Sequence, residues 1–368
     1  MQTDNIYITK PILPELTDFI SGVQHLFESG QLTNMGSLHN ELESKLKDEL
    51  FVKNFSLFNN GTTALFSALK ILNLPFGSEV ITTPYTFSAT VHSIVLCGLK
   101  PVFCDIEPDT MCIDTNKIEK LITDKTSAIL GVHVYGFPCD VFKIDKIAKK
   151  YNLKVIYDGA HVFSTKINGK GIGNFGDITM FSFHATKLFH TVEGGGLAYV
   201  DENLKSKINK FRNFGIVSED VVEGIGFNGK MNEIQALMGL KNLEIYKSEQ
   251  EKRKVLRKFY DEKLNIKGIR IPKMPKNVSD SYQYYPIIIG DDYPYSRDEV
   301  IKKLRDKNIY ARKYFYPACS DYDCYKNIDG INQLYVVNDI KNRVLCLPYY
   351  GNLEHNIRDL ICEVICDV

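Results

Sequence analysis

The sequence predicts an α/β protein in which a large, mostly parallel sheet domain is followed by a smaller α+β domain. Short β-branched runs alternate with longer amphipathic stretches from residue 55 onward, and this alternation is typical of parallel strands joined by crossover helices. The chain has 368 residues, which indicates two or three domains at about 150 residues each. Apolar residues make up 44% of the chain and charged residues 24%, the balance of an ordinary globular protein.

The expected strands follow one another with helices between them. A strand at 55–58 precedes a helix at 63–72, and a strand at 79–83 precedes a helix at 86–97. Because right-handed crossovers bring the carboxyl ends of parallel strands to one edge of the sheet, we expect the functional site at that edge. Further strands are expected at 101–105, 128–134, 154–158, 178–183 and 196–200, with a helix at 141–151.

A long, charge-rich helical stretch at 233–264 is expected to connect the two domains. Its charged side chains are those of a solvated helix face. We therefore predict a large domain at 1–244 and a small C-terminal domain at 245–368. Within the small domain, 285–289 is expected to be a strand and 297–307 a helix.

The composition excludes several classes of partner. The 45 basic residues cancel the 45 acidic ones, so the chain lacks the net positive field that draws proteins to nucleic acid or anionic membranes. No apolar run approaches the roughly 18 residues of a membrane span, and the N-terminus lacks the basic-then-apolar order of a signal peptide. We therefore expect a cytoplasmic protein. Its nine cysteines form no CxxC pair and have no suitably spaced histidines nearby, which predicts reduced thiols and no metal site.

Three features near the expected strand ends can carry chemistry. Asp158 ends an apolar strand, where a carboxylate can face a cationic ligand or simply cap the next helix. Lys187 follows an aromatic strand and precedes the glycines at 194–196. Most lysines are surface residues, but a buried one can lose its proton and act as a Schiff-base nucleophile. The segment 59–64 joins a strand to a helix, as a phosphate cradle or an ordinary turn with an N-cap does.

Together these features fit one cofactor, pyridoxal phosphate. Its phosphate needs amides at a helix N-terminus, its protonated ring nitrogen needs a carboxylate, and its aldehyde needs an amine. Neither P-loop spacing nor GxGxxG occurs in the chain, which argues against nucleotide hydrolysis and Rossmann-type dinucleotide binding.

The segment 181–187, Phe-Ser-Phe-His-Ala-Thr-Lys, followed by Glu-Gly-Gly at 193–195, resembles the cofactor-lysine segment of the DegT/DnrJ/StrS aminotransferases. These enzymes are the sugar branch of the fold-type I pyridoxal phosphate transferases. The resemblance covers nearly the whole chain in the family's order, and it implies the fold-type I architecture, transamination and a homodimer with shared active sites. Further matching segments lie at 60–64, 83–90, 133–136, 158–161, 212–215 and 227–236.

The resemblance also implies roles for individual residues. Lys187 would bind the cofactor aldehyde and move the proton, and Asp158 would keep the ring nitrogen protonated. His161 would hydrogen-bond the ring hydroxyl, at a position where many members carry glutamine. Phe87 would stack on the ring face, with a core aromatic at a helix start as the alternative interpretation of that residue. The phosphate would be held by Gly61, Thr62 and Ser182, and by Asn228 of the partner subunit.

The presence of Lys187 favours transamination within this family, because members with histidine at that position are sugar dehydratases. The segments 8–14, 32–37 and 309–317 resemble the members that aminate C4 of dTDP-4-keto-6-deoxyglucose, which implies glutamate as donor and dTDP-4-amino-4,6-dideoxyglucose as product. The related 3-aminotransferases carry a Ser-Gly-Trp-Tyr type phrase near residue 32, and this chain has no tryptophan. The family's products usually enter cell-surface polysaccharides such as lipopolysaccharide O-antigens.

Three alternatives stay open at this point: a 3-aminotransferase acting on a dTDP-3-keto-6-deoxyhexose, a 4-aminotransferase acting on a UDP-linked keto sugar, and a non-catalytic cofactor-binding regulator. A regulator of this fold is expected to carry a DNA-binding module or to lack Lys187.

Basic and aromatic side chains could bind a nucleotide diphosphate or a donor carboxylate, although a surface loop with aromatic packing explains most of them equally well. These candidates are Arg312, Tyr314 and Tyr316, with Arg212 as a weaker one.

Overall fold

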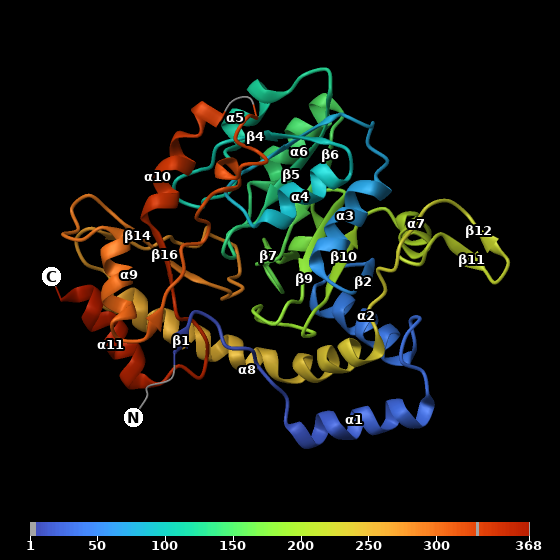
Figure 1. The fold of residues 1–368 in the computed structure, drawn as a ribbon, viewed down its shortest axis with the longest axis horizontal. Coiled ribbons are helices and arrows are strands. Elements are labelled where there is room, and N and C mark those ends of the chain that lie inside the picture. Colours follow the sequence, from blue (N-terminus) through green and yellow to red (C-terminus); the bar gives the residue numbers. More distant parts are fainter. Residues whose placement is uncertain (1–4, 329–330, 368) are drawn as a thin grey trace.

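The computed structural model describes residues 5–328 and 331–367 and confirms the α/β fold class (Figure 1). A seven-stranded sheet has the strand order β2-β10-β9-β6-β5-β3-β4. Neighbouring strands run parallel except at β10, which is antiparallel to both of its neighbours. The strands are β2 (Phe55–Phe58), β3 (Glu79–Thr82), β4 (Lys100–Phe103), β5 (Thr126–Val132), β6 (Lys154–Asp158), β9 (Ile178–Ser182) and β10 (Gly195–Tyr199).

Helices cover this sheet, and three of them begin at side-chain caps. The Asn60 Oδ1 atom accepts the Thr63 amide at 2.8 Å where α3 begins, and Asp140 Oδ1 accepts the Lys143 amide at 3.0 Å where α6 begins. Such caps satisfy amides that a helix leaves without an internal acceptor. The predicted helix at 141–151 coincides with α6. The covering helices are α2 (Ser37–Glu49), α3 (Gly61–Ile71), α4 (Ser88–Leu96), α5 (Thr115–Ile118), α6 (Val141–Tyr151) and α7 (Leu204–Phe211).

The long helix α8 (Glu233–Lys263) runs from beneath the large sheet to the C-terminal part of the chain (Figure 1). A capping box between Asn232 and Gln235 starts it. Its first half packs on α1 (Leu16–Ser29) and α2, while Leu256 and Tyr260 in its second half belong to a second hydrophobic core, formed mostly by the C-terminal part of the chain. The helix therefore crosses the predicted boundary at 244–245, and that boundary stays a prediction.

A three-stranded antiparallel sheet, β13-β14-β16, organises the C-terminal part. The strand β1 (Ile6–Tyr7) pairs in parallel with β15 (Ile309–Tyr310), so residues 6–7 lie beside this part. The helices and strands of this part are β13 (Ile269–Arg270), β14 (Tyr285–Ile289), β16 (Val344–Leu347), α9 (Arg297–Arg305), α10 (Tyr335–Arg343) and α11 (His355–Cys366). Two short hairpins come earlier in the chain: β7 (Lys166–Ile167) with β8 (Lys170–Gly171), and β11 (Ile216–Ser218) with β12 (Val221–Val222).

The described residues include no helix long and apolar enough to cross a bilayer. All nine cysteines are free thiols, and most of them are buried. Within the same described residues, no cluster of three or more histidine, cysteine or acidic side chains is arranged to hold a metal ion.

Candidate active site

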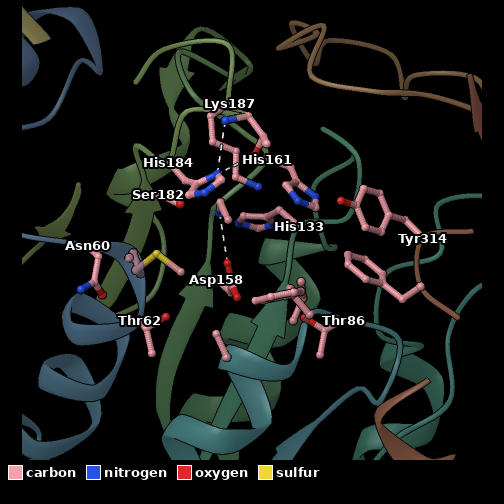
Figure 2. Close-up of a pocket in the computed structure, with 18 of the residues that line it drawn as sticks. Asn60, Thr62, Thr86, His133, Asp158, His161, Ser182, His184, Lys187 and Tyr314 are labelled. Carbon is pink, nitrogen blue, oxygen red and sulfur yellow. Dashed lines mark hydrogen bonds between the residues drawn. The ribbon is translucent and has the colours of Figure 1, made fainter. Parts of the chain in front are cut away.

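A pocket of about 650 Å³ lies at the carboxyl ends of β5, β6 and β9 (Figure 2), the sheet edge at which the crossovers predict a site. In Figure 2, Asp158 lies between Thr62 on one side and Tyr314 on the other, with Lys187 above it. The pocket brings together eight of the residues predicted from the sequence: Gly61, Thr62, Phe87, Asp158, His161, Ser182, Lys187 and Tyr314.

Asp158 is the last residue of β6, and only 6% of it is exposed. Its carboxylate accepts a hydrogen bond from Thr90 Oγ1 at 2.7 Å and one from the Ala160 amide at 3.1 Å. Burial raises the pKa of Asp158 above its usual value, while these two bonds and the nearby Lys187 lower it. Thr90 is itself linked to Thr86, whose hydroxyl lies 2.8 Å away. The hydroxyl groups of Thr90 in α4 and of Thr86 just before it therefore form a chain that stabilises the charged form of this carboxylate.

Lys187 lies in the connection between β9 and β10, and its side chain opens onto the pocket. The protein surrounds the amine on its other sides, and this burial lowers the pKa of Lys187 to about 8, against the opposing influence of Asp158. Its Nζ atom lies 5.7 Å from the centre of the Tyr284 ring. A lysine with this pKa has a substantial neutral fraction near neutral pH, which is the form that attacks a carbonyl carbon.

His161 is held as a neutral imidazole. The Tyr135 amide donates to its Nδ1 atom at 3.1 Å, so the proton of the neutral ring resides on Nε2. The ring stacks on Phe315 with centroids 6.1 Å apart and meets the Tyr284 ring edge at 4.9 Å. Burial, and to a smaller extent Lys187, lowers the pKa of His161 well below its usual value. His161 is therefore equipped to donate a hydrogen bond, as a glutamine amide would.

The N-terminus of α3 forms the opposite end of the pocket. Gly61 and Thr62 occupy its first turn, where backbone amides have no acceptor within the helix. A Cβ atom on Gly61 would lie 3.0 Å from the Cβ of Ser182, and one on Gly195 would lie 2.7 Å from the carbonyl oxygen of Asn60. Glycine at these positions lets β9, β10 and the helix terminus approach closely, and the result is a concentration of donors suited to an anion.

Four predicted residues lie outside the pocket. Arg212 is 2% exposed, donates to the Leu57 carbonyl and to Asn209 Oδ1, and forms an ion pair with Glu43 at 3.5 Å, so its charge is paired in the interior and does not face the pocket. The Arg312 guanidinium packs over Tyr314 with 5.3 Å to the ring centre, on the outer side. The other two are Tyr316, which is 47% exposed under Arg297, and Asn228, an exposed residue beside Asn59.

The structure adds residues that sequence reasoning did not assign to the site. Thr90 stands four residues after Thr86 in the motif 83–90, so one helical turn could have suggested that their hydroxyls meet. Tyr284 and Phe315 come from the C-terminal part of the chain, and no local pattern signals their arrival at the pocket. Other lining residues outside the predicted set are Asn60, Thr63, Thr86, Ala89, Val132, His133, Ala160, Met180, His184, Thr186 and Glu193.

Known proteins resemble this chain over nearly its full length. The model of the DegT/DnrJ/EryC1/StrS aminotransferase family matches residues 15–366. A dTDP-4-amino-4,6-dideoxy-D-glucose transaminase from Shigella dysenteriae is 43% identical over 364 residues, which cover 99% of each chain. An Escherichia coli protein of the same name is 42% identical over 363 residues, or 97% of each chain.

Solved structures show the same fold. PseC from Helicobacter pylori, an aminotransferase involved in the biosynthesis of pseudoaminic acid, superposes with a TM-score of 0.92 at 28% identity and 99% coverage of both chains. DesI, solved in the presence of its TDP-sugar product, superposes with a TM-score of 0.89 at 28% identity, covering 99% of this chain and 93% of that one.

Replacing Thr90 with valine is expected to lower the free energy of unfolding at neutral pH by about 1.5–3 kcal/mol, because the variant loses a hydrogen bond to a buried, charged carboxylate. Burial already raises the pKa of Asp158, and losing this bond raises it further. The destabilisation is therefore largest above that pKa and shrinks as the carboxyl group protonates at lower pH. Urea denaturation from acidic to neutral pH measures the effect. Thr90→Ser keeps the hydroxyl and is the matched control, so a loss that is equal in both variants or independent of pH contradicts the assignment.

Proposed function

The chain belongs to the DegT/DnrJ/EryC1/StrS aminotransferase family, as its motifs predict, and we propose that it transfers the amino group of L-glutamate to C4 of dTDP-4-keto-6-deoxy-D-glucose. The product would be dTDP-4-amino-4,6-dideoxy-D-glucose. The geometric observation that carries the proposal is that the Lys187 amine and the Asp158 carboxylate open onto one pocket. Near-full-length similarity to two transaminases named for this amino sugar supports the substrate.

The residues present fit pyridoxal phosphate as the cofactor. Asp158 is a buried carboxylate whose hydrogen bonds come from neutral donors, and such a group is stabilised by a cationic ring nitrogen. Gly61 and Ser182 form the close approach at the α3 N-terminus that a phosphate requires. His133 also lines the pocket, and its buried Nε2 atom has no hydrogen-bond partner among the described residues. Lys187 supplies the amine for the aldehyde.

When bound, the cofactor supplies an electron sink for the carbanion left after loss of a proton from the substrate carbon. Lys187 Nζ takes that proton and returns it, a task suited to a pKa of about 8. Asp158 would hold the proton on the ring nitrogen, and His161 would donate Nε2–H to the ring hydroxyl. Phe87, 62% exposed and lining the pocket, would stack on the ring face.

The donor and acceptor substrates would lie against a pocket wall that the C-terminal part of the chain supplies. Tyr284, Tyr314 and Phe315 form this wall, and their rings exclude water from the reacting atoms. His184 and Glu193 lie at the same pocket, with 3.5 Å between His184 Nε2 and Glu193 Oε1, and both side chains are about half exposed. They are placed to meet hydroxyl groups of a sugar.

A homodimer with shared sites completes the proposal. The hairpin of β11 and β12 projects from the large domain (Figure 1), and it exposes Val222 at 64% and, just beyond β12, Ile225 at 93%. Exposed apolar side chains of this kind are typical of surfaces that a second subunit covers. Asn228 follows this hairpin and is exposed, which suits a residue that acts on the phosphate in the partner subunit's pocket.

Absorbance spectroscopy tests cofactor, donor and acceptor in turn. The purified protein is expected to show a visible band from cofactor bound to Lys187, which glutamate bleaches and dTDP-4-keto-6-deoxyglucose restores. A band that glutamate bleaches but only a 3-keto sugar or a UDP-linked sugar restores overturns the substrate assignment and leaves the aminotransferase. Absence of any band after adding the cofactor contradicts the role of Lys187.

Replacing Asp158 with alanine is expected to lower kcat by about 10²–10³-fold, the loss typical when a preorganised charge-stabilising group is removed from an active site. The reason is that the ring nitrogen loses the carboxylate that keeps it protonated. Stopped-flow spectroscopy measures the rate constant of the glutamate half-reaction, which depends on the protonated ring. The Thr90→Ser variant serves as a control in the same hydrogen-bond chain. Near-normal turnover of Asp158→Ala would show that this carboxylate does not face the reacting ring.

Subunit mixing tests whether the site is shared. Lys187→Ala and Asn228→Asp are each expected to be inactive or severely impaired, the second because a carboxylate repels the cofactor phosphate. Denaturing and refolding the two variants together creates hybrid dimers in which one pocket carries neither change, provided that Asn228 acts across the interface. Recovery of activity on mixing is the expected result. No recovery, with dimers confirmed by light scattering, contradicts a shared site.

A further inference from the structure

A short segment, 280–284, leads into β14 and contacts the backbone next to Lys187. Within it, Gln283 is 2% exposed. Its Oε1 atom accepts the Leu188 amide at 2.8 Å, and its Nε2 atom donates to the Thr186 carbonyl at 3.1 Å. One amide side chain therefore binds the backbone on both sides of Lys187, although it lies 95 residues from Leu188 in the sequence.

The backbone around Lys187 needs such a partner. This stretch lies between β9 and β10 and belongs to neither a helix nor a strand, so no regular ladder satisfies its peptide groups. The Lys187 amide donates to the His184 carbonyl at 2.8 Å, and Leu188 is completely buried. A buried peptide group left without a partner costs free energy comparable to a lost hydrogen bond. Gln283 removes that cost on each side of the lysine.

Gln283 is itself held in place by its neighbours. Ser281 Oγ donates to the His161 carbonyl at 2.7 Å, and Arg253 Nη1 of α8 donates to the Tyr282 carbonyl at 3.3 Å. The next side chain, Tyr284, contacts Lys187 and the His161 ring. The segment is thus anchored to α8 on one side and to two active-site residues on the other.

We propose that Gln283 is a positioning residue for Lys187: its amide fixes the Lys187 backbone between two hydrogen bonds and so sets where the amine lies in the pocket. The proposal rests on the function proposed above for Lys187. With the backbone held on both sides, the position of Nζ depends only on the rotamers of one side chain. Catalytic steps require such control, because a displacement of about 1 Å can cost about 100-fold in rate.

Gln283→Met tests this proposal, because methionine has similar length and volume but forms neither bond. In the holoenzyme, the rate constant of the glutamate half-reaction, and with it kcat, is expected to fall about 100-fold. KM for the keto sugar is expected to change little. Gln283→Asn keeps the amide on a stem one carbon shorter that cannot reach both backbone groups, and a smaller loss in the same direction is expected. Tyr285→Phe is the matched control: Tyr285 lies two residues after Gln283, and the change removes its part-buried hydrogen bond to Asp261, away from the pocket.

A second readout does not depend on activity. In the cofactor-free protein, the rate of Lys187 acetylation by acetic anhydride is followed against pH by peptide mass spectrometry. The wild-type midpoint is expected at about 8, and in Gln283→Met it is expected to move upward, because the released amine is better solvated. Tyr285→Phe keeps the wild-type midpoint and kcat.

The outcomes separate the two proposals. If Gln283→Met and Gln283→Asn lose thermal stability but keep the wild-type midpoint and kcat, the residue is only structural and the inference is wrong. If Gln283→Met does not fold, Gln283→Asn decides: loss of thermal stability with the wild-type midpoint and kcat in that variant alone shows that the inference is wrong. If the wild-type protein binds no cofactor, the proposed function fails, while the acetylation profile still shows whether Gln283 positions the lysine.

Discussion

The buried carboxylate of Asp158 is the constraint on which the rest of the site depends. A carboxylate in the protein interior is unstable in its charged form unless donors or a cation face it. Here Thr90 and the Ala160 amide supply two neutral donors, and burial still raises the pKa of the group. The chain alone therefore stabilises this charge only in part. A protonated ring nitrogen in the pocket would complete the stabilisation, which links binding of the cofactor to its activation.

The same electrostatic balance governs the Lys187 amine. Burial lowers the pKa of Lys187, and the negative charge of Asp158 limits that decrease, so the amine keeps a pKa near the operating range of a general base. This balance holds only while the amine stays in its buried position. Gln283 and Tyr284 contact the Lys187 segment from the stretch that leads into β14, and Phe315, also from the C-terminal part of the chain, stacks on His161. The pocket is therefore complete only when the two parts of the chain are packed together.

Sequence analysis identified the residues whose proposed role follows from their type and their place at a strand end. Asp158 and Lys187 are of this kind, and the segment 59–64 lies at the helix terminus where it was expected. It missed Thr90 as a partner of Asp158, because the two are 68 residues apart. It also proposed Arg212 for the substrate, whereas the structure places this arginine in the core against Glu43. A single sequence does not distinguish a buried charge from a binding one, since both depend on neighbours that are distant along the chain.

The sequence by itself determined the alternation of strands and helices along the chain, the helix start at 59–64 and the three groups that suit one cofactor. These features follow from hydrophobic periodicity and capping, which act over a few residues. Only the tertiary structure decided that His161 carries its proton on Nε2, that the pKa of Lys187 is lowered to about 8, and that Gln283 binds the backbone on both sides of that lysine. The physical reason is that burial and hydrogen-bond partners arise from contacts between remote segments, which no local pattern encodes.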